Sequence, residues 1–143
     1  MKWLLIFLLF SALSTPVFAQ DMSAAEFETY TNGKTLFFGR DGKAYGAEEY
    51  LGNRRVRWSF LDGQCKEGYW YEDNSQICFV YEDRPDPQCW AFQKGPSGLI
   101  ARFINDPGST DLYEAQELGD EMVCLGPKAV SYTHLTLPTI LLV

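Results

Sequence analysis

Apolar and polar residues alternate strictly along residues 55–61, and this pattern predicts a half-buried β-strand. Val56, Trp58 and Phe60 fall on one face, and the residues between them are arginine or serine. Successive side chains of a strand point to opposite faces, so one face packs on a core and the other meets solvent.

Turn-forming residues recur at short, regular intervals after Gly33, which favours a series of short strands. The expected strands are Lys34–Phe38, Ala44–Tyr50, Arg55–Leu61, Cys65–Tyr71, Gln76–Tyr81, Gln88–Gln93, Leu99–Ile104, and a final pair near Leu112–Leu118 and Met122–Leu125. A Pro-rich loop at 82–87 separates two of them. Because the connections are short, we expect a mainly β fold, an antiparallel meander that forms a small barrel or a sandwich.

One short N-terminal helix is expected before the first strand. Ser23 and Glu26 have the spacing of a capping box, in which each side chain bonds the backbone N–H of the other residue. Phe27 and Tyr30 share a face of this helix, and Asn32-Gly33 provides its end. So short a helix is unstable alone, so it must pack on the strands.

Residues 1–19 have the pattern of a secretory signal peptide. Lys2 precedes the apolar run Trp3–Phe10, and Val17 and Ala19 are small residues placed for cleavage after position 19. The run is too short to cross a bilayer. We therefore expect a periplasmic or secreted protein whose mature chain has no membrane span and whose cysteines meet an oxidising compartment.

Residues 129–143 resemble a translated DNA adapter rather than natural protein sequence. Val130–Thr139 back-translates into the mosaic end and adapter of transposase-made sequencing libraries, and an index followed by a stop accounts for Ile140–Val143. We therefore expect one β-rich domain at 20–128. His134, the only histidine, belongs to the tail. Without it, the domain has no imidazole for triad catalysis or metal binding.

Four cysteines predict two structural disulfides. Cys65, Cys78, Cys89 and Cys124 allow three pairings, and their spacing contains no Cys-x-x-Cys motif of a zinc or redox site. If a hairpin closes at 82–85, Cys78 lies opposite Cys89, and Cys65 is left for Cys124. This pairing is favoured over the other two.

None of the acidic pairs is expected to form a catalytic or metal site, and the two pairs in predicted turns and the arginine cluster are interpreted as solvated surface. The acidic pairs are adjacent, and neighbouring side chains on a strand do not converge. The oxygens in two turns are too few and wrongly spaced for calcium. The arginines fit the solvent face of a strand. These groups are Glu48-Glu49, Glu72-Asp73 and Glu82-Asp83, the turn residues Asp73, Asn74, Asp83 and Asp86, and Arg54, Arg55 and Arg57. We expect no enzyme, cofactor or metal.

Aromatic residues recur on successive expected strands. They are Trp58, Phe60, Trp70, Phe79, Tyr81, Trp90 and Phe92. Inside a barrel they either fill the interior or line a pocket for an apolar ligand. Small cores need their aromatic residues for packing, so packing is the favoured interpretation.

Charge narrows the classes of partner. The chain has 19 Asp+Glu against 12 Lys+Arg, a formal net charge of −7, and loss of Lys2 with the signal peptide makes it one unit more negative. This argues against nucleic acid and anionic membranes as partners. A cationic protein partner is permitted, although acidity also serves solubility.

Three functions stay open. The leading one is a non-enzymatic periplasmic domain that binds a partner or supports the envelope. The second is an acidic inhibitor of a cationic envelope hydrolase such as a lysozyme, with acidic loops Glu72–Asp73 and Glu82–Asp86 on one sheet edge. The third is a barrel that carries a small apolar ligand.

Several segments resemble small exported alphaproteobacterial proteins of unknown function. These segments are Ala25–Thr35, Tyr45–Leu51, Arg55–Trp58, Ile77–Tyr81 and Cys89-Trp90. The resemblance covers most of 22–125 and implies a periplasmic, β-rich domain. It transfers no functional residue, and the tail has no counterpart in it.

Overall fold

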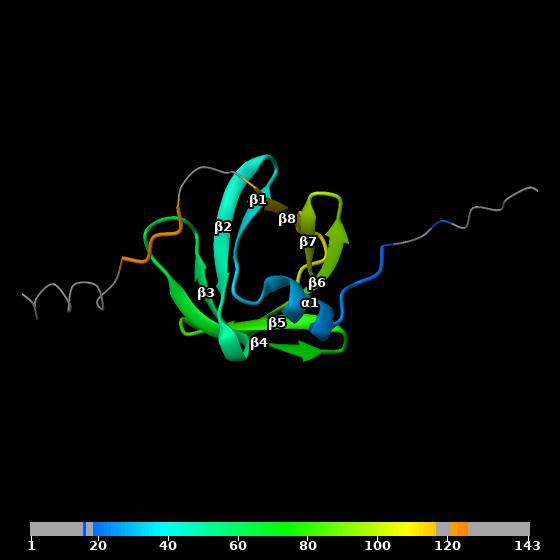
Figure 1. The fold of residues 1–143 in the computed structure, drawn as a ribbon, viewed down its shortest axis with the longest axis horizontal. Helices are drawn as coiled ribbons and strands as arrows, with labels where there is room; N and C mark the ends of the chain where they lie inside the picture. The colour runs from blue at the N-terminus through cyan, green and yellow to red at the C-terminus, as the bar shows by residue number, and fades with distance from the viewer. Residues whose placement is uncertain (1–15, 17–18, 117–120, 126–143) are drawn as a thin grey trace, which may run out of the picture.

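The computed structural model describes residues 16, 19–116 and 121–125 (Figure 1). The expected signal peptide lies largely outside these residues, and the adapter-like tail lies wholly outside them. Both therefore stay predictions.

Eight antiparallel strands form a closed barrel, which confirms the mainly β fold and selects the barrel over the sandwich (Figure 1). Each strand pairs with the next along the chain, and the last pairs with the first. The strands are β1 (Thr35–Arg40), β2 (Lys43–Tyr50), β3 (Arg55–Ser59), β4 (Lys66–Asp73), β5 (Gln76–Tyr81), β6 (Arg84–Gly95), β7 (Gly98–Phe103) and β8 (Leu112–Ala115), with a short 3-10 helix, η1 (Gly52–Arg54), before β3.

The expected strand at Met122–Leu125 is wrong. Residues 121–125 have no strand structure and are held against the β3–β4 loop instead. The Leu125 amide donates to the Gly63 carbonyl at 2.7 Å, and Cys124 is bonded to Cys65. The disulfide and this backbone hydrogen bond, rather than pairing with a strand, hold the segment in place.

The prediction of a Pro-rich loop over 82–87 is also wrong, because β6 begins at Arg84 after a two-residue turn. Tyr81 pairs with Arg84 and Phe79 pairs with Gln88, so residues 85–87 oppose Val80 in an irregular bulge. Proline lacks the N–H that a regular ladder needs, which explains why the irregularity falls here.

Both predicted disulfides are confirmed. Cys78 lies directly opposite Cys89 on β5 and β6, with Cα atoms 4.0 Å apart, and Cys65 is bonded to Cys124 with Cα atoms 5.2 Å apart. The predicted pairing of Cys78 with Cys89 is right although the turn is shorter than expected. The extra residues of the bulge in β6 restore the register before the cysteines are reached.

Helix α1 (Ala24–Thr31) plugs one end of the barrel, beside the β4–β5 turn (Figure 1). The predicted capping box is present: the Ser23 amide donates to Glu26 Oε2 at 2.8 Å, and the Glu26 amide donates to Ser23 Oγ at 3.2 Å. Phe27 is completely buried. Its ring lies 4.5–6.3 Å, between centroids, from the rings of Tyr50, Trp70, Phe79 and Phe92.

The Phe27 ring should be the largest single contributor from α1 to stability. We expect Phe27→Ala to lower the free energy of unfolding by about 3–5 kcal/mol, since it leaves a cavity among four aromatic rings. Urea denaturation measures this loss. The matched control is Phe60→Ala, at a ring that is 48 % exposed. A loss for Phe27→Ala no larger than that of the control would contradict the role of α1 as a plug.

Candidate functional site: a cavity in the barrel

The barrel interior contains a cavity of about 200 Å³, whose lining runs from rings that contact Phe27 to Lys66, Asp83 and Arg84 at the end opposite α1. Aromatic side chains form most of its wall, including Phe38, Trp58 and Trp90. A dry cavity of about 150 Å³ suffices to bind benzene. This cavity therefore admits a molecule about the size of one substituted ring.

The structure divides the predicted aromatic residues between two places. Trp58, Phe79, Tyr81 and Trp90 line the cavity. Trp70 instead packs edge-on against Phe27, with ring centroids 5.2 Å apart, and the Arg54 guanidinium covers it at 4.4 Å from its centroid. The packing interpretation therefore describes Trp70, whereas the other four residues also present a surface to the cavity.

Two glycines on the inner wall make room for these rings. A Cβ atom at Gly46 would overlap the Trp58 ring, and one at Gly68 would overlap the Val80 carbonyl and lie 2.9 Å from Tyr81 Cδ1. Any larger residue at either position would push Trp58 or Tyr81 out of place. These glycines therefore help to shape the cavity.

A β-bulge adds Tyr45 to the cavity wall. Phe38 pairs with Gly46 and Gly39 pairs with Ala44, which leaves Tyr45 as an extra residue in β2. A bulge reverses the alternation of side chains locally, so Tyr45 lines the cavity although Gly46 also faces inward. Its ring lies 5.8 Å from Trp58 and 5.7 Å from Phe60, between centroids.

Glu48 is the buried acid of the cavity, and it is 2 % exposed. The Tyr81 hydroxyl donates to its Oε1 at 3.0 Å, whereas its Oε2 has no hydrogen-bond partner in the described part of the chain. Burial raises the pKa of Glu48 well above its usual value, and the Tyr81 hydrogen bond offsets only part of this rise. Burial in the cavity therefore favours the neutral acid over the carboxylate.

Sequence reasoning did not identify Glu48 as a cavity residue. It correctly separated Glu48 from Glu49, which points outward and pairs with Arg57 at 3.5 Å. However, both faces of β2 carry a tyrosine and an alanine, so the pattern alone does not tell which face is inside. Only the pairing of Glu48 with Trp58 on β3 places it in the interior.

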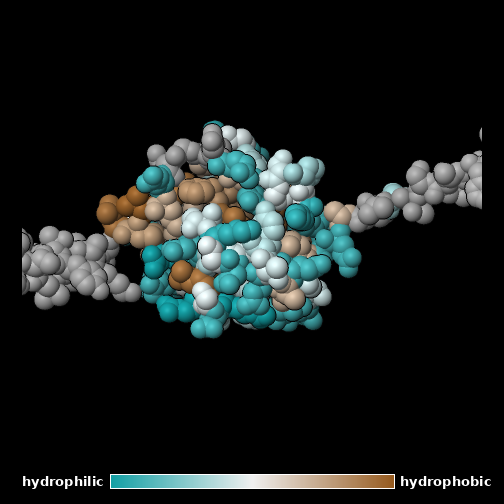
Figure 2. Space-filling view, viewed as in Figure 1, coloured by the Kyte–Doolittle hydropathy of each residue, from teal (hydrophilic) through white to brown (hydrophobic). Residues whose placement is uncertain are grey.

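Charged residues surround the mouth of the cavity. The Lys66 ammonium bonds the Asp83 carboxylate, which lowers the pKa of Asp83, and it also lies 5.6 Å from the centroid of the Phe60 ring. Arg84 and Gln88 complete this polar rim. Exposed apolar residues lie nearby, on the side of the barrel that carries residues 121–125 (Figure 2).

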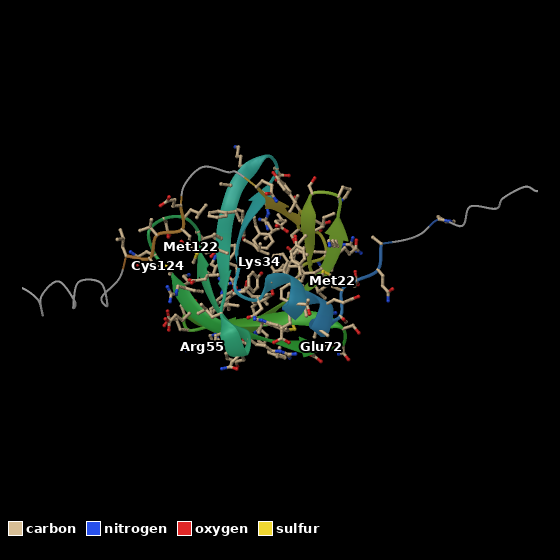
Figure 3. The ribbon with its side chains drawn as sticks, viewed as in Figure 1. Met22, Lys34, Arg55, Glu72, Met122 and Cys124 are labelled. Atoms are coloured by element: carbon tan, nitrogen blue, oxygen red, sulfur yellow. A yellow bond between two sulfur atoms is a disulfide. The ribbon has the colours of Figure 1, made fainter. Side chains whose placement is uncertain are left out.

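The arginine cluster lies outside the cavity, as its predicted place on a solvent face implies, and the structure pairs each arginine with a glutamate. Arg54 pairs with Glu28 at 3.3 Å, and Arg55 with Glu67 at 3.9 Å. The expectation that the acidic loops share one sheet edge is wrong, because the β4–β5 turn and the β5–β6 turn lie at opposite ends of β5. Glu72 lies on the α1 side of the barrel, away from Cys124 (Figure 3).

No group of three or more His, Cys, Asp or Glu residues within 16, 19–116 and 121–125 is placed to hold a metal ion. Over the same residues, no helix combines the length and apolarity that a membrane crossing requires.

No protein-family model, curated protein or solved structure matches the chain. Arguments about its function therefore start from the geometry of the cavity.

The buried Glu48 should make the folded protein lose stability as the pH rises. Its pKa is raised in the folded state, so above about pH 4.5 the unfolded chain releases this proton while the folded protein keeps it. We expect the stability advantage of Glu48→Gln over the wild type to grow by up to about 1.4 kcal/mol per pH unit from pH 4.5 towards the folded pKa. Urea denaturation at pH 5, 6 and 7 measures this, with Glu49→Gln as the control. A pH-independent difference would show that Glu48 is hydrated.

Proposed function

We propose that this protein is an exported, non-enzymatic binding protein that holds a small, largely apolar ligand in the barrel cavity. The observation that carries the proposal is the free Oε2 of Glu48 inside an aromatic cavity. A buried polar atom without a partner is costly, and a ligand group that bonds it would remove that cost.

Binding is favoured over catalysis by the acidic groups that line the cavity, Glu48 and Asp83. Acid–base catalysis by two carboxyl groups needs both to be available to a substrate. Asp83 is instead engaged by Lys66 at the rim. Glu48 has Tyr81 as its hydrogen-bond partner and aromatic rings around it, which suits holding a ligand in one orientation.

Export is supported by the signal-peptide pattern of residues 1–19 together with the two disulfides. Such bridges persist in oxidising compartments, which favours the periplasm or the extracellular space. The inhibitor alternative loses its geometric argument, because the acidic turns do not form one surface. The net negative charge that remains still permits a cationic partner.

Filling the cavity should abolish binding without unfolding the barrel. Ala101 lines the cavity and is 2 % exposed, so Ala101→Leu places extra carbon atoms inside it. The probes are ring-sized compounds, benzyl alcohol and benzylamine among them. We expect at least one to raise the melting temperature and shift the indole NMR signals of Trp58 and Trp90 in the wild type but not in Ala101→Leu.

The matched control is Ala44→Leu, at an exposed position of the same barrel. It should respond to the probes as the wild type does. Equal responses in Ala101→Leu and the wild type, or no response of the wild type to any probe at millimolar concentration, would overturn the proposed function.

A further inference from the structure

The hydrogen bond from Tyr81 prepares Glu48 to carry a negative charge. The hydroxyl donates to Oε1, and a donor at this position stabilises the carboxylate rather than the acid. What the carboxylate lacks is a positive charge near Oε2, which has no partner among the described residues. The site is therefore half of a buried ion pair.

The cationic side chains at the mouth do not supply the other half. Lys66 is bonded to Asp83, and Arg84 belongs to the polar rim. The two causes of the shifted pKa of Glu48 are its burial and the Tyr81 hydrogen bond, with no contribution from either cation. Oε2 therefore stays open to a positive charge that a ligand carries.

The cavity wall suits an organic cation. Tyr45, Trp58 and Trp90 present aromatic rings to the cavity, and the faces of such rings attract ammonium groups most strongly where water is excluded. One of these rings already makes such an interaction within the protein, because the Arg40 guanidinium lies 4.4 Å from the centroid of the Tyr45 ring.

The identity of residue 48 also favours a charged ligand. A glutamine would offer a donor and an acceptor to a neutral ligand, without the loss of stability that a buried carboxyl causes as the pH rises. The property that glutamate adds is the negative charge. That charge is useful in this cavity only when a cation neutralises it.

We propose that the cavity binds a small organic amine in its ammonium form, with the ammonium group at Glu48 Oε2 and the hydrocarbon part among the aromatic rings. This inference rests on the proposed function of the cavity. The amine enters as a cation, and the proton of Glu48 passes to the solvent. The bound state is thus an ammonium–carboxylate pair with no net charge.

Glu48 is the group whose ionisation should couple binding to pH. Burial also raises the pKa values of Tyr50 and Tyr81, which keeps both phenols neutral, and Lys66 lowers the pKa of Asp83, which keeps it ionised. The other titratable groups that line the cavity are Tyr45, Lys66 and Arg84. Because protons compete with the amine for Glu48, binding should weaken as the pH falls.

The test compares benzylamine with benzyl alcohol, which share a ring and differ in charge. Calorimetric titration of the wild type at pH 7 should show the amine binding at least about tenfold more tightly than the alcohol. Repeating it in buffers with different ionisation enthalpies should show release of up to about one proton per bound amine and none for the alcohol.

Glu48→Gln is the decisive variant, and Glu49→Gln, at the outward-facing neighbour, is its control. We expect Glu48→Gln to lose both the preference for the amine and the proton release, and Glu49→Gln to keep both. Equal binding of the two probes by the wild type, or an amine preference that survives in Glu48→Gln, would overturn the inference.

Comparison with Ala101→Leu separates failure of this inference from failure of the proposed function. If alcohol and amine bind equally and Ala101→Leu blocks both, the cavity is a ligand site for neutral molecules and only the cation is wrong. If Ala101→Leu leaves binding of both probes unchanged, the ligand site itself is elsewhere.

Discussion

Burial of the Phe27 ring inside one end of the barrel is the interaction that positions everything else. The ring meets side chains from β2, β4, β5 and β6, so a single residue of α1 fills the interior at that end. The opposite end has no such plug, and the cavity extends to it. The Phe27 cluster and the cavity share the rings of Tyr50, Phe79 and Phe92, so one set of side chains both completes the core and lines a ligand-sized space.

Closure of the barrel makes the cavity a defined space rather than a groove. β8 pairs with β1, which leaves no free edge in the sheet, and the two disulfides lie beside the cavity half. The Cys78–Cys89 bridge joins β5 to β6 just outside the inward-facing Phe79, Tyr81 and Trp90. The bridges therefore fix the strands that hold the aromatic wall.

Local patterns in the sequence were sufficient for much of the fold. The capping box and the hairpin register at the cysteines depend on nearby residues, and both are confirmed. The alternation at 55–61 is only partly right, because β3 ends at Ser59, which is buried, and Phe60 is 48 % exposed. The pairing of β1 with β8 joins segments that are far apart in the sequence. Local patterns do not report such a pairing, so they did not distinguish a barrel from a sandwich. The errors at 82–87 and 122–125 arose where prolines or a disulfide replaced regular pairing. Glu48 was missed because its face depends on a partner strand and on the bulge at Tyr45.

The most direct test of the buried acid is an NMR titration of the side-chain carboxyl carbons in ¹³C-labelled protein, with the Glu48 signal assigned by its loss in Glu48→Gln. In the free protein, the Glu48 signal should remain that of the neutral acid well above pH 4.5, while the exposed glutamates ionise near that value. A Glu48 carboxyl that titrates together with the exposed glutamates would contradict the account, since it would show water around the group on which the cavity depends.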